Sequence, residues 1–325
     1  MKLLVIGLGS MGRRRIRLLK KYDKTATVVG IDLSHERRKN VELELNIETK
    51  ETIDEAVKRD SFDCAFICTS PLSHSKLINA CLQLGLHVFT ELNLVSDGYE
   101  DNTALAVANN KVLFLSSTFL YRAEIMKIEE LVKQHDKNLN YTYHIGQYLP
   151  DWHPWENYMD FFVGDKRTNG CREIFAIELP WIAKVFGPIR EFVVRKDKIS
   201  TLNVDYADNY LILIEHESGH KGMLAVDIVS RKAVRNLEII GEDLYLSWDG
   251  SAEGLQVFDI EQKANVTVRL YDHVDQLESY SKFIIENAYL SEIESFFKAI
   301  SMSIQPKYTF EEDKKILDII DRIEA

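Results

Sequence analysis

The sequence has few cysteines, and their spacing is irregular. The four of them, Cys64, Cys68, Cys81 and Cys171, form no Cys-x-x-Cys pair. That pattern excludes a disulfide framework and gives no support for a zinc site, so we expect no bound metal. Cys64 and Cys68 lie in an apolar run and are expected to be buried as small hydrophobic residues, whereas Cys171 stays open as a loop thiol.

Long apolar runs and an excess of basic residues are also missing. The apolar start of the chain, Met1–Gly7, is too short for a signal peptide or a membrane span, and no later run is long enough. We therefore expect a cytoplasmic protein that makes no membrane contact. Forty Lys and Arg residues against fifty-one Asp and Glu residues give a net charge of −11, which would repel nucleic-acid phosphates. Nucleic acid is therefore not an expected partner.

Strands and helices alternate over residues 1–118. With 325 residues and 46% apolar content, the chain is long enough to form two domains. Apolar runs predict strands at Lys2–Ile6, Thr27–Ile31, Phe62–Cys68, His87–Thr90 and Val112–Ser116, and helical spacing predicts helices at Arg13–Tyr22, Ser73–Leu84 and Tyr99–Asn110. This order predicts a doubly wound α/β Rossmann domain with a parallel sheet.

Residues 119–325 follow a different pattern, in which strands succeed one another directly. Strands are expected near Tyr141–Leu149 and at Ile189–Lys196, Tyr210–Glu217, Lys221–Val229, Arg235–Ile240 and Asp243–Trp248. Helices are expected at about Ala123–His135, Arg172–Val185, Tyr289–Ser301 and Phe310–Ile323. We predict an α+β domain with a largely antiparallel sheet that binds substrate and forms the oligomer, with a C-terminal helix free to pack back on the first domain.

A Gly-x-Gly-x-x-Gly pattern follows the first expected strand and opens the first expected helix. Gly7 permits the tight turn, Gly9 lets the backbone approach a pyrophosphate, and Gly12 lets helix and strand pack closely. Ser10 and Met11 lie at the helix N-terminus, which faces the phosphates of a dinucleotide. In this context the pattern predicts a dinucleotide-binding site.

Asp32 supports this prediction, because it lies twenty residues past Gly12 at the end of the second strand. An acid at that position accepts hydrogen bonds from the ribose hydroxyls of the adenosine. Its charge would repel a 2′-phosphate, so we expect NAD as the cofactor. Arg37 and Arg38 leave NADP open, because an arginine there can neutralise that phosphate, although both also fit the solvated face of a helix.

Three stretches carry a resemblance to a known family. They are the glycine motif at residues 7–12, the segment Cys68–Pro71 followed by His74, and the segment Val88–Glu91. Together they resemble the glucose-fructose oxidoreductase/inositol dehydrogenase/MocA (Gfo/Idh/MocA) family. The resemblance spans nearly the whole chain. It implies a Rossmann domain fused to an antiparallel-sheet domain, action on sugars, cyclitols or nucleotide-linked sugars, and assembly through the open sheet face. It further implies that the nicotinamide half of the cofactor is lined by Thr69, Pro71, His74 and Glu91.

Two residues that the family uses are replaced in this chain. The family reads Glu-Lys-Pro where this sequence reads Glu91-Leu92-Asn93, so the lysine that contacts the reacting hydroxyl is absent. It also carries an Asp and, four residues on, a His before a Phe-Gly pair, where this sequence has Glu173 and Ile177. A group that takes the hydroxyl proton is worth about 10²- to 10⁴-fold in rate, so another side chain must supply it.

An aromatic segment from Gly146 to Tyr158 holds several candidates for that role. Trp152 and Trp155 suit stacking on a sugar or nucleobase, and His153 or Tyr148 suits acid/base chemistry. The alternative is that the tryptophans anchor a long loop by packing and that His153 is a surface residue.

The expected helix at Arg172–Val185 and the start of the second domain hold the remaining candidates. Glu173 occupies the family's Asp position and is the preferred catalytic carboxylate. Arg172 suits bidentate binding of a substrate carboxylate or phosphate. Tyr121 and Arg122 would orient the substrate, or would form a structural pair between the domains.

These observations together predict an NAD-dependent oxidoreductase that acts on a sugar or nucleotide-linked sugar and forms a homodimer or homotetramer. A pseudoenzyme or sensor that binds the dinucleotide without turnover is the alternative. A transferase or lyase that uses tightly held NAD as a transient oxidant is a third hypothesis.

Overall fold

The computed structural model describes residues 1–154, 156–277 and 281–325. Its contacts divide the chain into two compact units. Unit 1 comprises Met1–Ser117 and Tyr289–Leu317, and unit 2 comprises Thr118–Ala288 and Asp318–Ala325. The sequence suggested a boundary after residue 118, with a C-terminal helix free to pack back on the first domain. The contacts assign residues 289–317 to the first unit.

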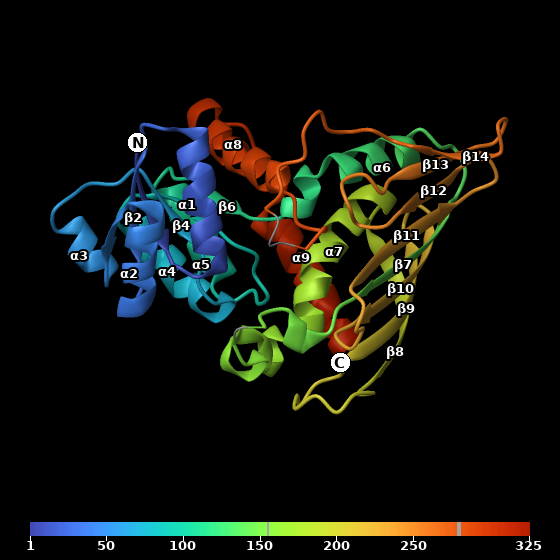
Figure 1. Ribbon diagram of the computed structural model, residues 1–325, viewed down its shortest axis with the longest axis horizontal. Coiled ribbons are helices and arrows are strands. Elements are labelled where there is room, and N and C mark those ends of the chain that lie inside the picture. The colour runs from blue at the N-terminus through green and yellow to red at the C-terminus, as the bar shows by residue number, and fades with distance from the viewer. Residues whose placement is uncertain (155, 278–280) are drawn as a thin grey trace. The chain divides into compact units, whose positions relative to one another are not determined.

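Unit 1 contains a six-stranded parallel sheet in the order β3-β2-β1-β4-β5-β6 with helices on both faces (Figure 1). Its strands are β1 (Lys2–Ile6), β2 (Thr27–Ile31), β3 (Glu48–Lys50), β4 (Cys64–Ile67), β5 (His87–Thr90) and β6 (Leu113–Leu115). Its first helices are α1 (Ser10–Tyr22), α2 (His35–Leu45), α3 (Ile53–Val57), α4 (Pro71–Gln83) and α5 (Tyr99–Ala108). The predicted doubly wound Rossmann fold is confirmed, and the strand order reverses between β1 and β4.

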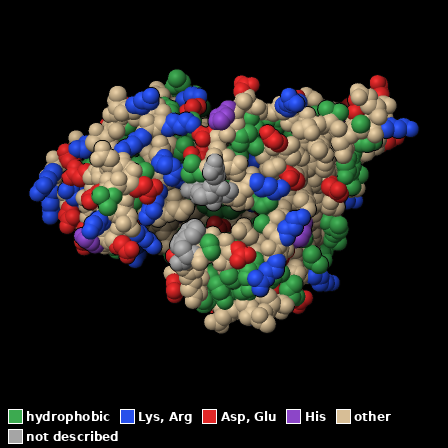
Figure 2. All heavy atoms as spheres, in the orientation of Figure 1, with side chains coloured by type: hydrophobic (Ala, Val, Ile, Leu, Met, Phe, Trp, Pro, Cys, Tyr) green, Lys and Arg blue, Asp and Glu red, His purple; other side chains and the backbone are tan. Residues whose placement is uncertain are grey.

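The two central strands of unit 1 are buried along almost their whole length, because helices cover both faces of a parallel sheet. Every residue of β4 is buried, including Cys64. The free thiols of Cys68 and Cys81 are buried as well, so the expected burial of Cys64 and Cys68 is confirmed. The expectation of a loop thiol at Cys171 is wrong, because this residue lies in a helix (residues 170–186) and is fully buried. On the face shown in Figure 2, acidic and basic side chains intermingle over unit 1 instead of gathering by sign.

Helix α8 (Glu286–Met302) explains why residues far along the chain belong to unit 1. The ring of Phe296 meets those of Phe66, Phe89 and Phe114 edge-on, with centroids 5.3 to 5.7 Å apart. Phe297 stacks on Tyr22 at 4.9 Å. Each buried phenylalanine contributes roughly 2 to 3 kcal/mol, so α8 is part of the hydrophobic core of this unit.

Unit 2 contains an eight-stranded sheet in the order β14-β13-β12-β11-β7-β10-β9-β8. Its strands are β7 (Asn140–Gly146), β8 (Ile189–Asp197), β9 (Asn209–His216), β10 (Lys221–Asp227), β11 (Val234–Ile240), β12 (Tyr245–Trp248), β13 (Gln256–Asp259) and β14 (Ala264–Thr267). Among the strand pairs described in this second sheet, only β7 and β10 are parallel, and the others are antiparallel. The predicted largely antiparallel sheet is confirmed.

One face of this second sheet is covered by helices. Helices α6 (Ala123–Lys133) and α7 (Gly170–Phe186) lie on the same side of it (Figure 1). Strand β9 alternates accordingly, with Tyr210, Ile212 and Ile214 buried and the residues between them more exposed. Helix α9 (Phe310–Glu324) closes the fold; residues 310–317 belong to unit 1 and residues from 318 onward to unit 2.

The other face of the second sheet exposes apolar side chains. Val193 pairs with Leu213, and Leu213 pairs with Met223, so three apolar residues stand in register on adjacent strands. Each of them is more than half exposed. No helix in the described ranges combines the length and the apolar character that a membrane crossing requires.

Candidate functional site

The glycine turn after β1 has no room for side chains at two positions. Gly7 has φ +91°, and a Cβ there would lie 2.7 Å from the Cys68 carbonyl oxygen. A Cβ at Gly12 would lie 1.9 Å from the Gly7 carbonyl oxygen. Gly9, by contrast, faces open space, with nothing within 4 Å of where a Cβ would stand. The turn is therefore closed toward the protein and open at Gly9, as a backbone that approaches a pyrophosphate requires.

The N-terminus of α1 continues this opening. The helix begins at Ser10, its N-cap Gly9 offers no side chain, and its first turn contains no acidic residue. The first N–H groups of the helix therefore keep their hydrogen-bonding capacity and partial positive charge for an anion. The cradle fits the pyrophosphate of NAD(P), which Gly9, Ser10 and Met11 would hold through their backbone.

Asp32 is fixed at the end of β2 by two backbone hydrogen bonds. Its Oδ2 accepts from the Leu8 amide at 2.8 Å, and its Oδ1 accepts from the Ser34 amide at 2.8 Å. A carboxylate accepts about four hydrogen bonds, so capacity remains for ribose hydroxyls. The loop that carries Gly7 and Gly9 is thus attached directly to the residue that would select the ribose.

The two arginines after Asp32 differ in their freedom. Arg38 donates to the Asp32 carbonyl oxygen at 2.6 Å and also to Glu51 at 3.2 Å. Arg37 lies 3.9 Å from the Asp32 carboxylate, and its side chain is 55% exposed. Arg38 is therefore engaged by the protein, and only Arg37 of the pair is free to turn toward a 2′-phosphate.

A buried histidine joins the loops after β4 and β5. His74 Nε2 lies 2.9 Å from the Thr69 carbonyl oxygen, and Nδ1 lies 2.6 Å from the Asn93 side-chain oxygen. Burial lowers the pKa of His74, so the ring is neutral near pH 7. The Thr69 hydroxyl lies 2.7 Å from that of Ser73, and Pro71 starts α4 at the position that tolerates a missing N–H. Asn93 thus occupies the position of the family's proline and holds His74.

Glu91 faces into the protein. Its carboxylate accepts from Arg15 at 2.5 Å and 3.2 Å. Arg15, which is fully buried, also donates to Glu292 at 2.7 Å. Glu292 in turn accepts from the Ser117 amide at 2.8 Å. Glu91 therefore connects β5 with α1 and α8, and this structural contact of its carboxylate is distinct from the nicotinamide-lining role suggested by the resemblance.

Glu173 lies in the first turn of α7 in unit 2. Its Oε2 is buried and has no hydrogen-bond partner in the part of the chain that the structure describes. Burial raises the pKa of Glu173 to about 7. A carboxyl group that gains and loses its proton near neutral pH has the property that a general acid or base needs.

The neighbouring Arg172 is already paired. The Asn169 side chain caps α7 by accepting from the Arg172 amide at 2.8 Å. The guanidinium group of Arg172 donates to Asp321 at 2.7 Å and to Glu324, both on α9. Arg172 is thus placed as a structural link between the C-terminal part of α9 and the start of α7, and not as an open anion-binding arginine.

The aromatic loop is only partly gathered near α7. Trp152 donates to the Gln147 carbonyl oxygen at 3.3 Å and lies close to Gly170, the first residue of the helix. His153 stacks on Phe161 with centroids 4.6 Å apart, and its Nδ1 lies 2.7 Å from Glu156.

Two further residues of the loop were predicted to take part in the site. The ring of Tyr148 lies under the guanidinium group of Arg231, 3.5 Å from centroid to carbon. Trp155 lies outside the described residues.

The pair at the start of unit 2 is internal to it. Arg122 is 1% exposed, donates to Glu124 at 2.9 Å and 3.1 Å, and donates to the Phe283 carbonyl oxygen at 3.0 Å. It also lies over the ring of Trp248, and Tyr121 beside it is buried. These contacts describe a structural ion pair of unit 2. In the described residues, no three His, Cys, Asp or Glu side chains are grouped to hold a metal ion.

Sequence reasoning missed the two buried clusters that surround these residues. Arg15 meets Glu292 across 277 positions, and Arg172 meets Glu324 across 152. Residues so far apart in sequence belong to no common helical or strand repeat, so only the folded chain brings these charges together.

The chain is similar to known proteins in sequence and in fold. Residues 1–116 match the family model GFO_IDH_MocA, described as an oxidoreductase family with an NAD-binding Rossmann fold. The myo-inositol 2-dehydrogenase of Thermotoga maritima is 24% identical to this chain. The alignment covers 98% of this chain and 93% of that protein.

Two solved structures share the fold over both units. GenD2 from gentamicin A biosynthesis, solved in complex with NAD, has a TM-score of 0.76 at 17% identity and covers 100% of this chain and 94% of its own. The UDP-N-acetylglucosamine 3-dehydrogenase GnnA of Acidithiobacillus ferrooxidans has a TM-score of 0.72 at 18% identity, with 99% and 96% covered. At these identities the likeness establishes the fold.

Proposed function

Because the chain belongs to the Gfo/Idh/MocA oxidoreductase family and binds NAD(P) through its Rossmann unit, we propose that it oxidises or reduces a sugar or nucleotide-linked sugar, with Glu173 as the acid/base group. The observation that carries this proposal is the Glu173 carboxyl, which is buried, lacks a hydrogen-bond partner at Oε2 among the described residues, and has a pKa of about 7.

The substrate class is supported by the relatives. One is named for a cyclitol dehydrogenase activity, and another for a dehydrogenase of a nucleotide-linked sugar. Both names describe oxidation of a carbinol in a ring that carries several hydroxyl groups. Trp152, beside the start of α7, offers the aromatic face that such a ring stacks on.

The division of work follows from the chemistry of carbinol oxidation. A bound nicotinamide supplies the acceptor or donor of a hydride. Gly9 and the N-terminus of α1 hold the pyrophosphate, and Asp32 holds the adenosine ribose, with NAD preferred over NADP. Above about pH 7, ionised Glu173 accepts the proton of the substrate hydroxyl at Oε2. Below that pH, the protonated form returns a proton to a ketone oxygen in the reverse direction.

The lack of the family's lysine favours a second candidate function. Leu92 and Ile177 stand where the family places Lys and His, so the lysine that contacts the reacting hydroxyl and the helix histidine are both replaced by apolar residues here. A protein that binds NAD(H) as a sensor without turnover is consistent with that loss. His153 and Tyr148, whose observed contacts lie within or beside their own loop, remain secondary proposals for the acid/base role.

The first test is cofactor binding followed by turnover. Protein stripped of nucleotide is titrated with NAD(H) and NADP(H), and a panel of neutral sugars, sugar acids, cyclitols and nucleotide-linked sugars is then assayed. Glu173→Gln is expected to lower kcat/KM by about 10²- to 10⁴-fold, with Glu253→Gln, an exposed residue, as the matched control. Binding without turnover of any panel member favours the sensor, and full activity of Glu173→Gln removes Glu173 from the mechanism.

We also propose that the exposed face of the second sheet joins copies of this chain as a homodimer or homotetramer. The in-register row of Val193, Leu213 and Met223 supports this, since apolar side chains on a sheet face are stabilised when covered. Light scattering of the purified protein tests it. Leu213→Asp is expected to shift the mass toward the monomer, and a monomeric wild-type protein would contradict the proposal.

A further inference from the structure

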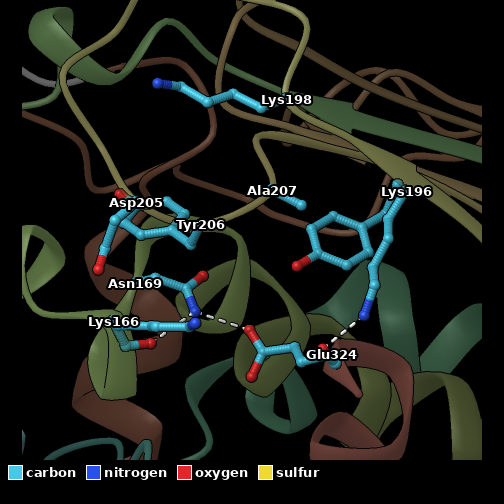
Figure 3. Close-up of a pocket in the computed structure, with 9 residues that line it drawn as sticks. Lys166, Asn169, Lys196, Lys198, Asp205, Tyr206, Ala207 and Glu324 are labelled. Atoms are coloured by element: carbon cyan, nitrogen blue, oxygen red, sulfur yellow. Dashed lines mark hydrogen bonds between the residues drawn. The ribbon is translucent and has the colours of Figure 1, made fainter.

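A cavity of about 370 Å³ opens in unit 2 beside the start of α7 (Figure 3). It lies between the end of β8, the segment before β9 and the last residue of α9, Glu324. A volume of this size falls within the range of about 300 to 1,000 Å³ that small-molecule sites occupy. The cavity is large enough for a small organic or inorganic anion.

Several of its polar groups are satisfied within the protein. The Asn169 side chain donates to the Lys166 carbonyl oxygen at 3.0 Å and to Glu324 at 2.7 Å. Lys196 donates to the Glu324 carbonyl oxygen at 2.5 Å (Figure 3). Its positive charge is favourable there, because the C-terminus of a helix carries a partial negative charge. Glu324 is further neutralised by Arg172. These groups form a fixed wall whose own charges are balanced.

Three other groups remain available to a ligand. Lys166 and Lys198 line the cavity, and neither forms an ion pair with any described residue. Tyr210 is 2% exposed and lines the cavity, yet its hydroxyl has no hydrogen-bond partner within the described ranges. The hydroxyl of the neighbouring Tyr206, by contrast, donates to the Val163 carbonyl oxygen at 2.8 Å.

The Tyr210 hydroxyl is a proton donor in this setting. Burial raises the pKa of Tyr210, so the phenol keeps its proton. The hydroxyl is reached from the cavity and makes no hydrogen bond to a described residue, so it can donate to a ligand oxygen that enters there. Asp205 also lines the cavity and carries one negative charge. The charge of Glu324 is balanced by Arg172, so the two unpaired lysines give the cavity a net positive charge.

This cavity is separate from the proposed acid/base group. The ring of Phe175 on α7 meets the ring of Tyr210 edge-on, with centroids 5.2 Å apart. Glu173 lies two residues before Phe175 on the same helix, so the two side chains point about 200° apart around the helix axis. Helix α7 therefore presents Glu173 on the face opposite to the one that borders the cavity.

We propose that the cavity is a binding site for a small anion with a phosphate or carboxylate group, held by Lys166, Lys198 and the Tyr210 hydroxyl, and distinct from the site of Glu173. Lys166 and Asn169 stand directly before α7, and Asn169 caps it. An anion at Lys166 therefore stabilises the N-terminal end of the helix that carries Glu173.

Calorimetric titration of the full, nucleotide-free chain tests the proposal. Inorganic phosphate and citrate are titrated separately in a chloride buffer of low ionic strength, so that the two arms distinguish a phosphate from a carboxylate ligand. We expect saturable binding of at least one probe. The Lys166→Ala/Lys198→Ala variant is expected to bind it about tenfold or more weakly, since each lost charge-assisted hydrogen bond costs about 1.5 kcal/mol or more.

Matched variants keep the result unambiguous. Lys24→Ala/Lys298→Ala removes the same charge from exposed positions of unit 1 and is expected to bind as the wild type does. Tyr210→Phe keeps the ring against Phe175 and removes only the hydroxyl, and weaker binding is expected here as well. An unchanged circular dichroism spectrum and an unchanged thermal unfolding midpoint show that each variant is folded. The proposal is overturned if neither probe binds saturably, if the control pair weakens binding equally, or if Tyr210→Phe binds unchanged.

Discussion

Glu173→Gln is expected to stabilise the protein, and the gain is expected to depend on pH. The pKa of Glu173 rises from the usual 4.5 to about 7 because the carboxyl is buried. The unfolded chain therefore loses this proton at a lower pH than the folded chain. A raised pKa contributes stability that is present below about pH 4.5 and is lost as the pH rises to about 7.

The magnitude follows from the size of the shift. Each pKa unit corresponds to about 1.4 kcal/mol, so ionising Glu173 in the folded protein costs about 3 kcal/mol above pH 7. Glutamine is nearly isosteric with the protonated carboxyl and cannot ionise. The variant should therefore differ from the wild type by less than about 1 kcal/mol near pH 5 and by about 3 kcal/mol near pH 8.

Urea denaturation at a series of pH values measures this difference without knowledge of the substrate. The exposed Glu253→Gln serves as the control and should track the wild type at each pH. A free-energy difference between Glu173→Gln and the wild type that stays constant from pH 5 to pH 8 would refute the argument, because it would show that Glu173 titrates normally in the folded state.

Three further predictions concern other sites. Asp32→Ala is expected to weaken NAD(H) binding about tenfold in a fluorescence titration, since it removes a charged acceptor from the ribose site; equal affinity would exclude that contact. Arg15→Met is expected to cost about 3 to 5 kcal/mol in chemical denaturation, because Glu91 and Glu292 are left buried without their cation; a cost below about 1 kcal/mol would contradict this. Burial lowers the pKa of His216, so as the pH falls below about 6.5 the unfolded chain binds this proton before the folded chain does. The free energy of unfolding therefore decreases by up to about 1.4 kcal/mol for each pH unit of acidification. In His216→Gln the free energy of unfolding should decrease less steeply with acidification, and the same steepness as in the wild type would contradict the prediction.

The sequence predicted the order of elements well where apolar runs were long. β1 and β2 were predicted with their observed bounds, because a buried parallel strand reads as an uninterrupted apolar run. β3 and α3 were not predicted, since three and five residues are too short for a period to be visible. The cut after residue 118 could not reveal α8 as part of unit 1, because the contacts of Phe296 are made across the sheet and not along the chain.

The candidate site was predictable to different degrees. The roles of Gly7 and Gly12 follow from a local turn, and the structure leaves no space for a side chain at either position. The carboxylates of α9 that engage Arg172 are distant in sequence, so no local pattern could indicate that this arginine is already paired. The raised pKa of Glu173 depends on burial, which spacing alone does not specify.

The position of α8 has a consequence for how the protein is made. Three phenylalanines of the nucleotide-binding sheet, Phe66, Phe89 and Phe114, have emerged from the ribosome long before Phe296, the residue that covers them. During that interval the first sheet exists without part of its core while more than 170 further residues are synthesised. A fragment that stops at residue 118 would keep every glycine of the cofactor loop and still expose these rings, so it is expected to aggregate, and only the addition of residues 289–317 restores its cover.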